Sequence, residues 1–145
     1  SVSRDINKCD IVVGDKLVQH DFDLTLFDHE KGYIPNIGTY IPCDSNRVEI
    51  AKTIEMDTKV ETGVISSGDI FVSDEKMGAK INNKFNALCV EMEGVGLFTI
   101  AKYRKCSASA IYIITDVIDN EGWHLGWNGK KIAKAIERII DAIVN

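Results

Sequence analysis

The chain has 145 residues, of which 45% are hydrophobic and 27% are charged, and its formal net charge is −5. This composition is typical of one folded domain with a sizeable core, and it excludes a disordered or repetitive chain. The sequence contains no block of Lys and Arg of the kind that neutralises a phosphate backbone, which argues against a nucleic-acid partner.

The four cysteines, Cys9, Cys43, Cys89 and Cys106, are scattered without the paired spacing of metal ligands. Such spacing favours reduced thiols in a cytoplasmic protein over a zinc site or a disulfide framework. No apolar run approaches the roughly 20 residues of a membrane span, and the first residues lack a signal-peptide pattern. We therefore expect a cytoplasmic protein that does not contact a membrane.

Apolar periodicity predicts strands that alternate with helices. The first strand is expected at 9–14, where CDIVVG forms a short apolar run. A long loop is expected at 19–44, and its length suggests a function. Ser45 is a good N-cap for the first helix. The following elements are predicted as a helix at 45–56, a strand at 60–66, a helix at 74–85, a strand at 87–92, a helix at 93–105, a strand at 108–116 and a last helix from about Asn128.

Three of these elements carry predictions about burial. The helix at 93–105 is apolar on nearly every side and is expected to be largely buried. The strand at 108–116 is continuously apolar, as strands covered on both faces are. The last helix is expected to face the core with one stripe, formed by Ile132, Ile136, Ile139, Ile140 and Ile143.

Alternating strands and helices predict a three-layer α/β/α fold around a mixed, mostly parallel sheet, in a single domain over residues 1–145. In such sheets, ligands bind beyond the carboxyl ends of the strands. This rule selects three segments of the chain, at 66–72, 91–94 and 115–119.

Each segment has a functional and a structural interpretation. Glu93, next but one to Glu91, stands where a helix begins, and it either binds a ligand or complements the helix dipole. Asp116 follows the Ile-rich strand, and it either holds or protonates a ligand or makes an N-cap or Asx turn. Phe71 either covers a flat heterocycle or is a core residue.

Weaker patterns concern metals and cofactors. His20 with Asp21 and Asp23 is more typical of a hydrogen-bonded turn or a subunit contact than of a metal site, because no further His lies close by. The GxG at 94–96 lacks the third glycine of the dinucleotide fingerprint. We therefore expect neither a metal nor a cofactor. The late loop is expected to cover a site or pack an interface with Trp123, His124 and Trp127.

Four motifs together carry a resemblance to a known family. They are VVGDKLVQHDFDLTLFDHEKGYIP at 12–35, SSGDIFV at 66–72, VEMEG at 90–94 and ITDVID at 114–119. In this order, over nearly the whole chain, they resemble the nucleoside phosphorylase superfamily, and within it the 5'-methylthioadenosine/S-adenosylhomocysteine nucleosidases. The resemblance implies a homodimer that needs no cofactor and hydrolyses an N-glycosidic bond, giving adenine and a 5-thio-substituted ribose.

The resemblance also implies roles for individual residues. Asp116 would donate a proton toward adenine N7, and Glu93 would bind the ribose hydroxyls. Met92 would lie against the sugar, Phe71 would stack on adenine, and the backbone of Val72 would hydrogen-bond the edge of the base. The positions that match residues closing the 5'-thio pocket of the neighbouring subunit are Leu24, Phe27 and Pro35.

Members of this family carry a first strand, a Gly-rich turn and a water-activating Glu before the segment that matches Val12, and no residues of this chain match them. We therefore expect a fragment or a shortened homologue. The alternative hypotheses are a purine nucleoside phosphorylase, another nucleoside hydrolase such as one acting on futalosine, and a nucleoside-binding domain without catalysis. The residues at 20–23 and those after Asp116 favour the nucleosidase.

Overall fold

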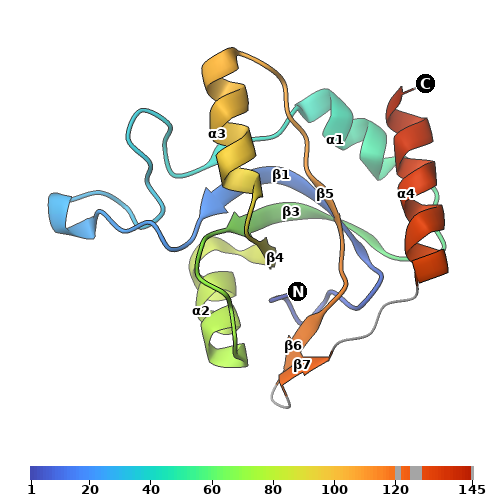
Figure 1. The fold of residues 1–145 in the computed structure, drawn as a ribbon, viewed down its shortest axis with the longest axis horizontal. Helices are drawn as coiled ribbons and strands as arrows, with labels where there is room; N and C mark the ends of the chain where they lie inside the picture. Colours follow the sequence, from blue (N-terminus) through green and yellow to red (C-terminus); the bar gives the residue numbers. More distant parts are fainter. Residues whose placement is uncertain (120–121, 125–128, 145) are drawn as a thin grey trace.

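A computed structural model describes residues 1–119, 122–124 and 129–144 of the chain (Figure 1). The strands are β1 (Ile11–Gln19), β2 (Ile41–Pro42), β3 (Val60–Ser67), β4 (Ala87–Glu91), β5 (Ile111–Ile113), β6 (Val117–Asp119) and β7 (Gly122–His124). The helices are α1 (Ser45–Lys52), α2 (Glu75–Phe85), α3 (Gly94–Arg104) and α4 (Gly129–Val144), with one 3-10 turn, η1 (Thr25–Phe27). Within these described residues, no helix has the length and apolarity needed to cross a membrane.

The main sheet is mixed, with β1 at its centre. β1 pairs parallel with β3, and β3 pairs parallel with β4. β1 also pairs antiparallel with two short strands, β2 beside Lys16 and Leu17 and β5 beside Ile11 to Val13. β6 and β7 form a separate hairpin. The predicted mixed sheet is confirmed.

The parallel strands end at the same level of the sheet. Gln19 at the end of β1 pairs with Ser67 at the end of β3, and Ser67 pairs with Glu91 at the end of β4. The segments that follow these three strands therefore start side by side, at the edge where α/β sheets bind ligands.

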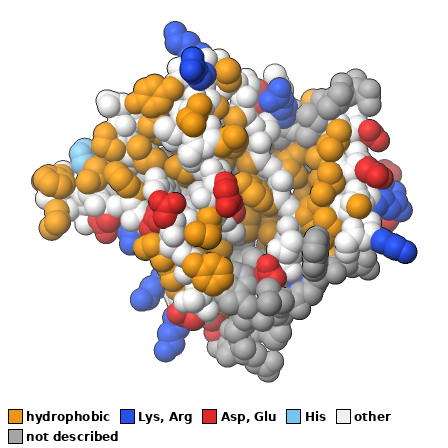
Figure 2. Space-filling view, in the orientation of Figure 1, with side chains coloured by type: hydrophobic (Ala, Val, Ile, Leu, Met, Phe, Trp, Pro, Cys, Tyr) orange, Lys and Arg blue, Asp and Glu red, His pale blue; other side chains and the backbone are white. Residues whose placement is uncertain are grey.

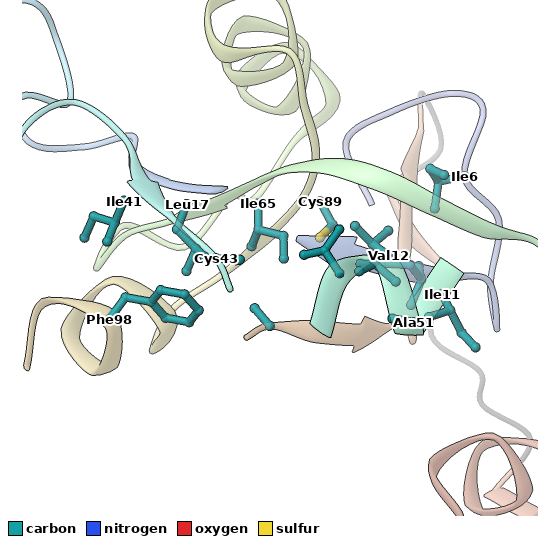
Figure 3. Close-up of a cluster of buried hydrophobic side chains, with 14 of the residues drawn as sticks. Ile6, Ile11, Val12, Leu17, Ile41, Cys43, Ala51, Ile65, Cys89 and Phe98 are labelled. Atoms are coloured by element: carbon teal, nitrogen blue, oxygen red, sulfur yellow. The ribbon is translucent and has the colours of Figure 1, made fainter. Parts of the chain in front are cut away.

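Helices cover both faces of the sheet and make three layers (Figure 1). On one face, α2 packs Ile81 and Phe85 against a small cluster of strand side chains. On the other face, the larger core contains Ala51 from α1, Phe98 from α3 and Ala135 from α4. Figure 3 shows part of this larger core, in which aliphatic strand side chains gather with Ala51 and Phe98. The three-layer prediction is confirmed.

The first strand is longer than predicted. β1 continues through Gly14 to Gln19, whereas the sequence predicted an end at residue 14. Gly14 is a packing position and not a strand end, because a Cβ added there would lie 2.5 Å from Cδ1 of Ile65. The register with β3 shifts between Gly14 and Lys16, which lets the strand continue past this close contact.

The first helix is shorter than predicted and has a different cap. α1 ends at Lys52, and its N-cap is Asp44, whose side chain accepts a hydrogen bond from the amide of Arg47 at 3.0 Å. Ser45, the predicted cap, is the first residue inside the helix. Ala51 is buried, as the pattern predicted.

The predicted burial of the helix at 93–105 is wrong within this chain. Phe98 of α3 is buried, but Leu97, Ile100 and Tyr103 are 61%, 65% and 69% exposed. Figure 2 shows hydrophobic side chains gathered on the surface over α3. An apolar surface of this kind marks an interaction site more often than an inert face.

The predicted strand at 108–116 is also shorter. β5 covers only Ile111–Ile113 and pairs with β1, and its three side chains are half-buried. The continuous apolar run therefore does not correspond to burial on both faces. The hydrophobic stripe predicted for the last helix is only partly in the core: Ile132 is buried, but Ile136 and Ile140 are 45% and 53% exposed.

Some predictions lie outside the described residues. They concern Trp127 and the start of the last helix at Asn128. For four further residues only the side chains lie outside the description: Asp119, Trp123, His124 and Ile143.

Candidate active site

A cavity of about 460 Å³ lies at the level where the parallel strands end. Pockets that hold small ligands have volumes of roughly 300–1,000 Å³. The lining comes from Ser1, from His20 after β1, from residues 70–72 after β3, from 89–92 at the end of β4 and from 112–116 at β5 and beyond. The cavity thus includes the edge that the parallel strands predicted, but residues 112–116 reach it from β5, which pairs antiparallel with β1.

Four of the predicted site residues line this cavity: Phe71, Val72, Met92 and Asp116. Val72 is buried, whereas Phe71 is 62% and Met92 44% exposed. The ring of Phe71 and the thioether of Met92 therefore present apolar surface that a bound ligand would cover. The four residues reach the cavity from segments that are far apart in the sequence, which the individual motifs did not show.

Asp116 lies three residues beyond β5 and is half-buried. Its Oδ2 accepts a hydrogen bond from Oγ1 of Thr115 at 2.7 Å. An ionised carboxylate accepts at both of its oxygens. Thr115 can therefore orient the Asp116 side chain and still leave Oδ1 to interact with a ligand.

The two acids of VEMEG have different surroundings. Glu91 lines the cavity, and its Oε2 accepts hydrogen bonds from the amides of Glu93 at 2.8 Å and Gly94 at 2.7 Å. Glu91 thereby satisfies free amides at the N-terminus of α3, where an acid is favoured. The Glu93 side chain is exposed, and its Oε2 accepts from the amide of Met92 at 3.3 Å. Glu93, a predicted site residue, is not part of the lining.

Tyr112 and Cys89 line the cavity as well, although sequence reasoning gave neither of them a role. Burial, and after it the charge of Glu91, raises the pKa of the Tyr112 phenol, which stays protonated at neutral pH. Burial raises the pKa of Cys89 to about 12, so this thiol is a poor nucleophile. The signal for Tyr112 was its phenol within an otherwise aliphatic run, AIYII.

His20, Asp21 and Asp23 have separate surroundings. His20 is 4% exposed, and burial lowers the pKa of its imidazole against the smaller opposing effect of the Asp21 charge. Asp21 accepts from two amides of the loop after β3, and Asp23 accepts from the amide and hydroxyl of Thr25. Among the described residues, no three His, Cys, Asp or Glu side chains are grouped to hold a metal ion. The predicted hydrogen-bonded turn therefore describes Asp23, whereas Asp21 links two loops that are 48 residues apart in the sequence.

The residues predicted to close the 5'-thio pocket of the neighbouring subunit lie away from the cavity of their own chain. Leu24, Phe27 and Pro35 belong to the loop between β1 and β2, which projects from the body of the molecule (Figure 1), and they do not line the cavity. Phe27 is 71% and the neighbouring Leu26 is 94% exposed, and Figure 2 shows hydrophobic side chains at the tip of this loop. The loop therefore does not complete the cavity of its own chain.

The chain matches the family model described as the phosphorylase superfamily over residues 1–145. It is 32% identical to an aminodeoxyfutalosine nucleosidase of Helicobacter pylori over 123 residues, which are 83% of this chain and 54% of that protein. It is 31% identical to a 5'-methylthioadenosine/S-adenosylhomocysteine nucleosidase of Glaesserella parasuis over 130 residues, which are 88% of this chain and 56% of that protein. The chain thus spans about half the length of these relatives.

Solved structures share the fold. The native structure of futalosine hydrolase of Helicobacter pylori superposes with a TM-score of 0.85 at 30% identity, over 97% of this chain and 64% of that chain. The nucleosidase of Helicobacter pylori solved with butyl-thio-DADMe-Immucillin-A gives a TM-score of 0.77 at 30% identity, over 99% of this chain and 59% of that chain. Because the family model matches all 145 residues and these folds agree, the chain belongs to the phosphorylase superfamily.

Proposed function

We propose that the protein hydrolyses the N-glycosidic bond of 5'-methylthioadenosine and S-adenosylhomocysteine, releasing adenine and a 5-thio-substituted ribose. The observation that carries the proposal is the meeting of Phe71, Val72, Met92 and Asp116 around one cavity. In a purine nucleoside, an aromatic ring suits the flat base and a backbone group suits the edge of the base. A thioether suits the sugar, and a carboxyl group suits the departing base. Relatives named for nucleosidase reactions support the same class of chemistry.

In the proposed reaction, the bond between ribose C1' and adenine N9 breaks, and its electron pair leaves with the base. Asp116 gives a proton to adenine N7, so that the base departs as a neutral molecule. The ribose becomes an oxocarbenium-like cation, which Glu93 stabilises while it holds the hydroxyls. Water adds to C1', and the proton that it releases restores the acid.

Hydrolysis of aminodeoxyfutalosine is the second candidate, because the Helicobacter pylori relative carries that name. The residues that line the described cavity do not discriminate between 5'-methylthioadenosine and aminodeoxyfutalosine as the substrate. The loop that holds Leu24, Phe27 and Pro35, which would contact the 5' substituent, lies away from the cavity of its own chain. The choice of nucleoside therefore depends on surfaces that a second copy would supply.

Free adenine is expected when the natural polypeptide is incubated with 5'-methylthioadenosine in phosphate-free buffer, because water accepts the ribosyl group in hydrolysis. Chromatographic quantification of adenine, in parallel reactions with aminodeoxyfutalosine, measures both candidates. A strict requirement for phosphate would instead assign the protein to the phosphorylases. Thermal stabilisation by the nucleoside without any product would support the non-catalytic binding domain.

We also propose that the protein is a homodimer. The exposed apolar surface of α3 and the projecting loop with Leu26 and Phe27 support this proposal. Covering such side chains with a second copy would remove apolar area from water, which is the main driving force of association. In this arrangement the loop of one copy would lie beside the cavity of the other.

Ile100→Asp on α3 is expected to convert the dimer to a monomer at micromolar concentration, because it places a charge in the apolar surface. Ile100 is 65% exposed, so the change leaves the core of the chain intact. Ile50→Asp, at a 41% exposed isoleucine of α1, is the matched control and should leave the mass unchanged. Sedimentation equilibrium of the three proteins makes the measurement. A wild-type monomer, or an Ile100→Asp dimer, would contradict the proposed interface.

We further propose that the protein acts in the cytoplasm. All four cysteines are free, and Cys43 and Cys89 are buried. Burial raises the pKa of Cys43 to about 11, so this thiol is protected from oxidation. Free, unpaired cysteines suit a reducing compartment.

A further inference from the structure

Asp21 connects the loop after β1 to the loop after β3. One of its oxygens, Oδ2, accepts hydrogen bonds from two consecutive amides, that of Asp69 at 2.6 Å and that of Ile70 at 3.1 Å. Hydrogen bonds from backbone amides to a carboxylate are charge-assisted and stronger than bonds between neutral groups. The carboxylate therefore fixes two adjacent peptide units at the start of the loop.

The two amides immediately precede the residues that are proposed to hold the base. Residues 68–72 belong to no helix or strand, so no regular ladder sets their conformation. Ile70, Phe71 and Val72 all line the cavity. Because these residues are consecutive, a backbone rotation at residues 69 and 70 would displace the ring of Phe71 and the backbone of Val72 together.

Asp21 is itself positioned by the sheet. Gln19 pairs with Ser67 at the strand ends, and the amide of His20 donates to the carbonyl of Ser67 at 2.9 Å. On the other side, the amide of Gly68 donates to the carbonyl of Glu91 at 3.2 Å. Beyond Gly68, the Asp21 carboxylate continues the attachment for the next two residues, through the amides of Asp69 and Ile70.

We propose that Asp21 is a positioning residue, which holds residues 69–72 in the conformation that binds a purine base. The inference rests on the proposed function, because Phe71 and Val72 contact the base only if the cavity binds an adenine nucleoside. Asp21 acts through the backbone and need not touch the substrate. It therefore governs affinity for the base more than the chemical step, which involves Asp116.

Asp21→Ala is expected to weaken the binding of free adenine by at least roughly tenfold, as measured by titration calorimetry, because two charge-assisted bonds are lost. With 5'-methylthioadenosine, KM should rise more than kcat falls. Asp21→Asn should restore most of the affinity, because its amide oxygen can accept the same two hydrogen bonds. Asp44→Ala is the control: it removes another carboxylate that caps an amide, that of Arg47, away from the cavity.

Hydrogen exchange gives a second readout that does not depend on substrate. The amides of Asp69 and Ile70 should exchange faster in Asp21→Ala than in the wild type or in Asp44→Ala. Unchanged exchange in Asp21→Ala would overturn the inference, and so would faster exchange with unchanged adenine affinity. If the wild type binds no adenine, the proposed function fails and the role in base binding fails with it. Weaker adenine binding in Asp21→Ala alone, with binding retained in the wild type and in Asp44→Ala, supports both the proposed function and the role of Asp21.

Discussion

Replacing Asp116 by Asn is expected to lower turnover of 5'-methylthioadenosine by about 10²–10⁴-fold, the usual contribution of general acid catalysis. Asn keeps the size of the side chain, and its carbonyl oxygen can still accept from Oγ1 of Thr115, which lies 2.7 Å from Oδ2 of Asp116. The amide has no acidic proton to give to the departing base. Substrate affinity should therefore change little while the chemical step slows. Equilibrium binding measures the affinity, and single-turnover rates measure the chemical step.

The same chemical change elsewhere provides the control. Asp44→Asn alters the N-cap of α1, where Asn is about as favourable as Asp, so neither the melting temperature nor turnover should change. A rate for Asp116→Asn within a few-fold of the wild type would rule out Asp116 as the acid. Loss of binding in parallel with turnover would assign it a binding role instead.

The meeting of Phe71 and Met92 could be predicted from the sequence because it follows from topology. Each of these two residues comes soon after a strand of the parallel ladder, and parallel strands in a three-layer fold end at one edge of the sheet. The register at Gln19, Ser67 and Glu91 aligns these strand ends. The place of Asp116 does not follow from this rule, because β5 pairs antiparallel with β1 and ends beside Ile11, at the start of β1.

The roles of Asp21 and Glu91 could not be predicted in the same way. Each carboxylate accepts two consecutive backbone amides, and which amides lie within reach depends on how the loops turn. For Asp21 the partners are about 48 residues further along the chain. Glu91 had one local signal, because an acid placed shortly before a helix often satisfies its free amides.

The predictions about α3 and β5 failed for a different reason. Apolar residues on every side of a helix indicate that its surfaces will be covered, but not whether the cover belongs to the same chain. In α3, Phe98 faces the core while Ile100 is 65% exposed. A continuous apolar run is equally ambiguous in β5, which pairs with β1 over three residues and stays half-buried.

Gly68→Ala is expected to impair the base site and the stability of the fold together. A Cβ added at Gly68 would lie 2.5 Å from Nε2 of His20 and 2.8 Å from Cγ of Asp21, distances that require a neighbour to move. His20 is 4% exposed and has little room, so the strain should also displace the Asp21 carboxylate from the loop amides. Overpacking of this kind costs about 1–3 kcal/mol in the free energy of unfolding. Urea denaturation and adenine calorimetry measure the two effects.

Two further variants separate this steric effect from a general effect of the substitution. Gly129→Ala, at the start of α4, has no atom within 4 Å of the added Cβ and should change stability by no more than about 0.5 kcal/mol. In the background of Gly68→Ala, His20→Ala removes the closest clashing atom, so part of the stability and of the adenine affinity should return. Wild-type adenine affinity in Gly68→Ala would mean that the loop tolerates displacement. Weak affinity that His20→Ala does not improve would place the strain at Asp21, the residue proposed to hold the base-binding loop.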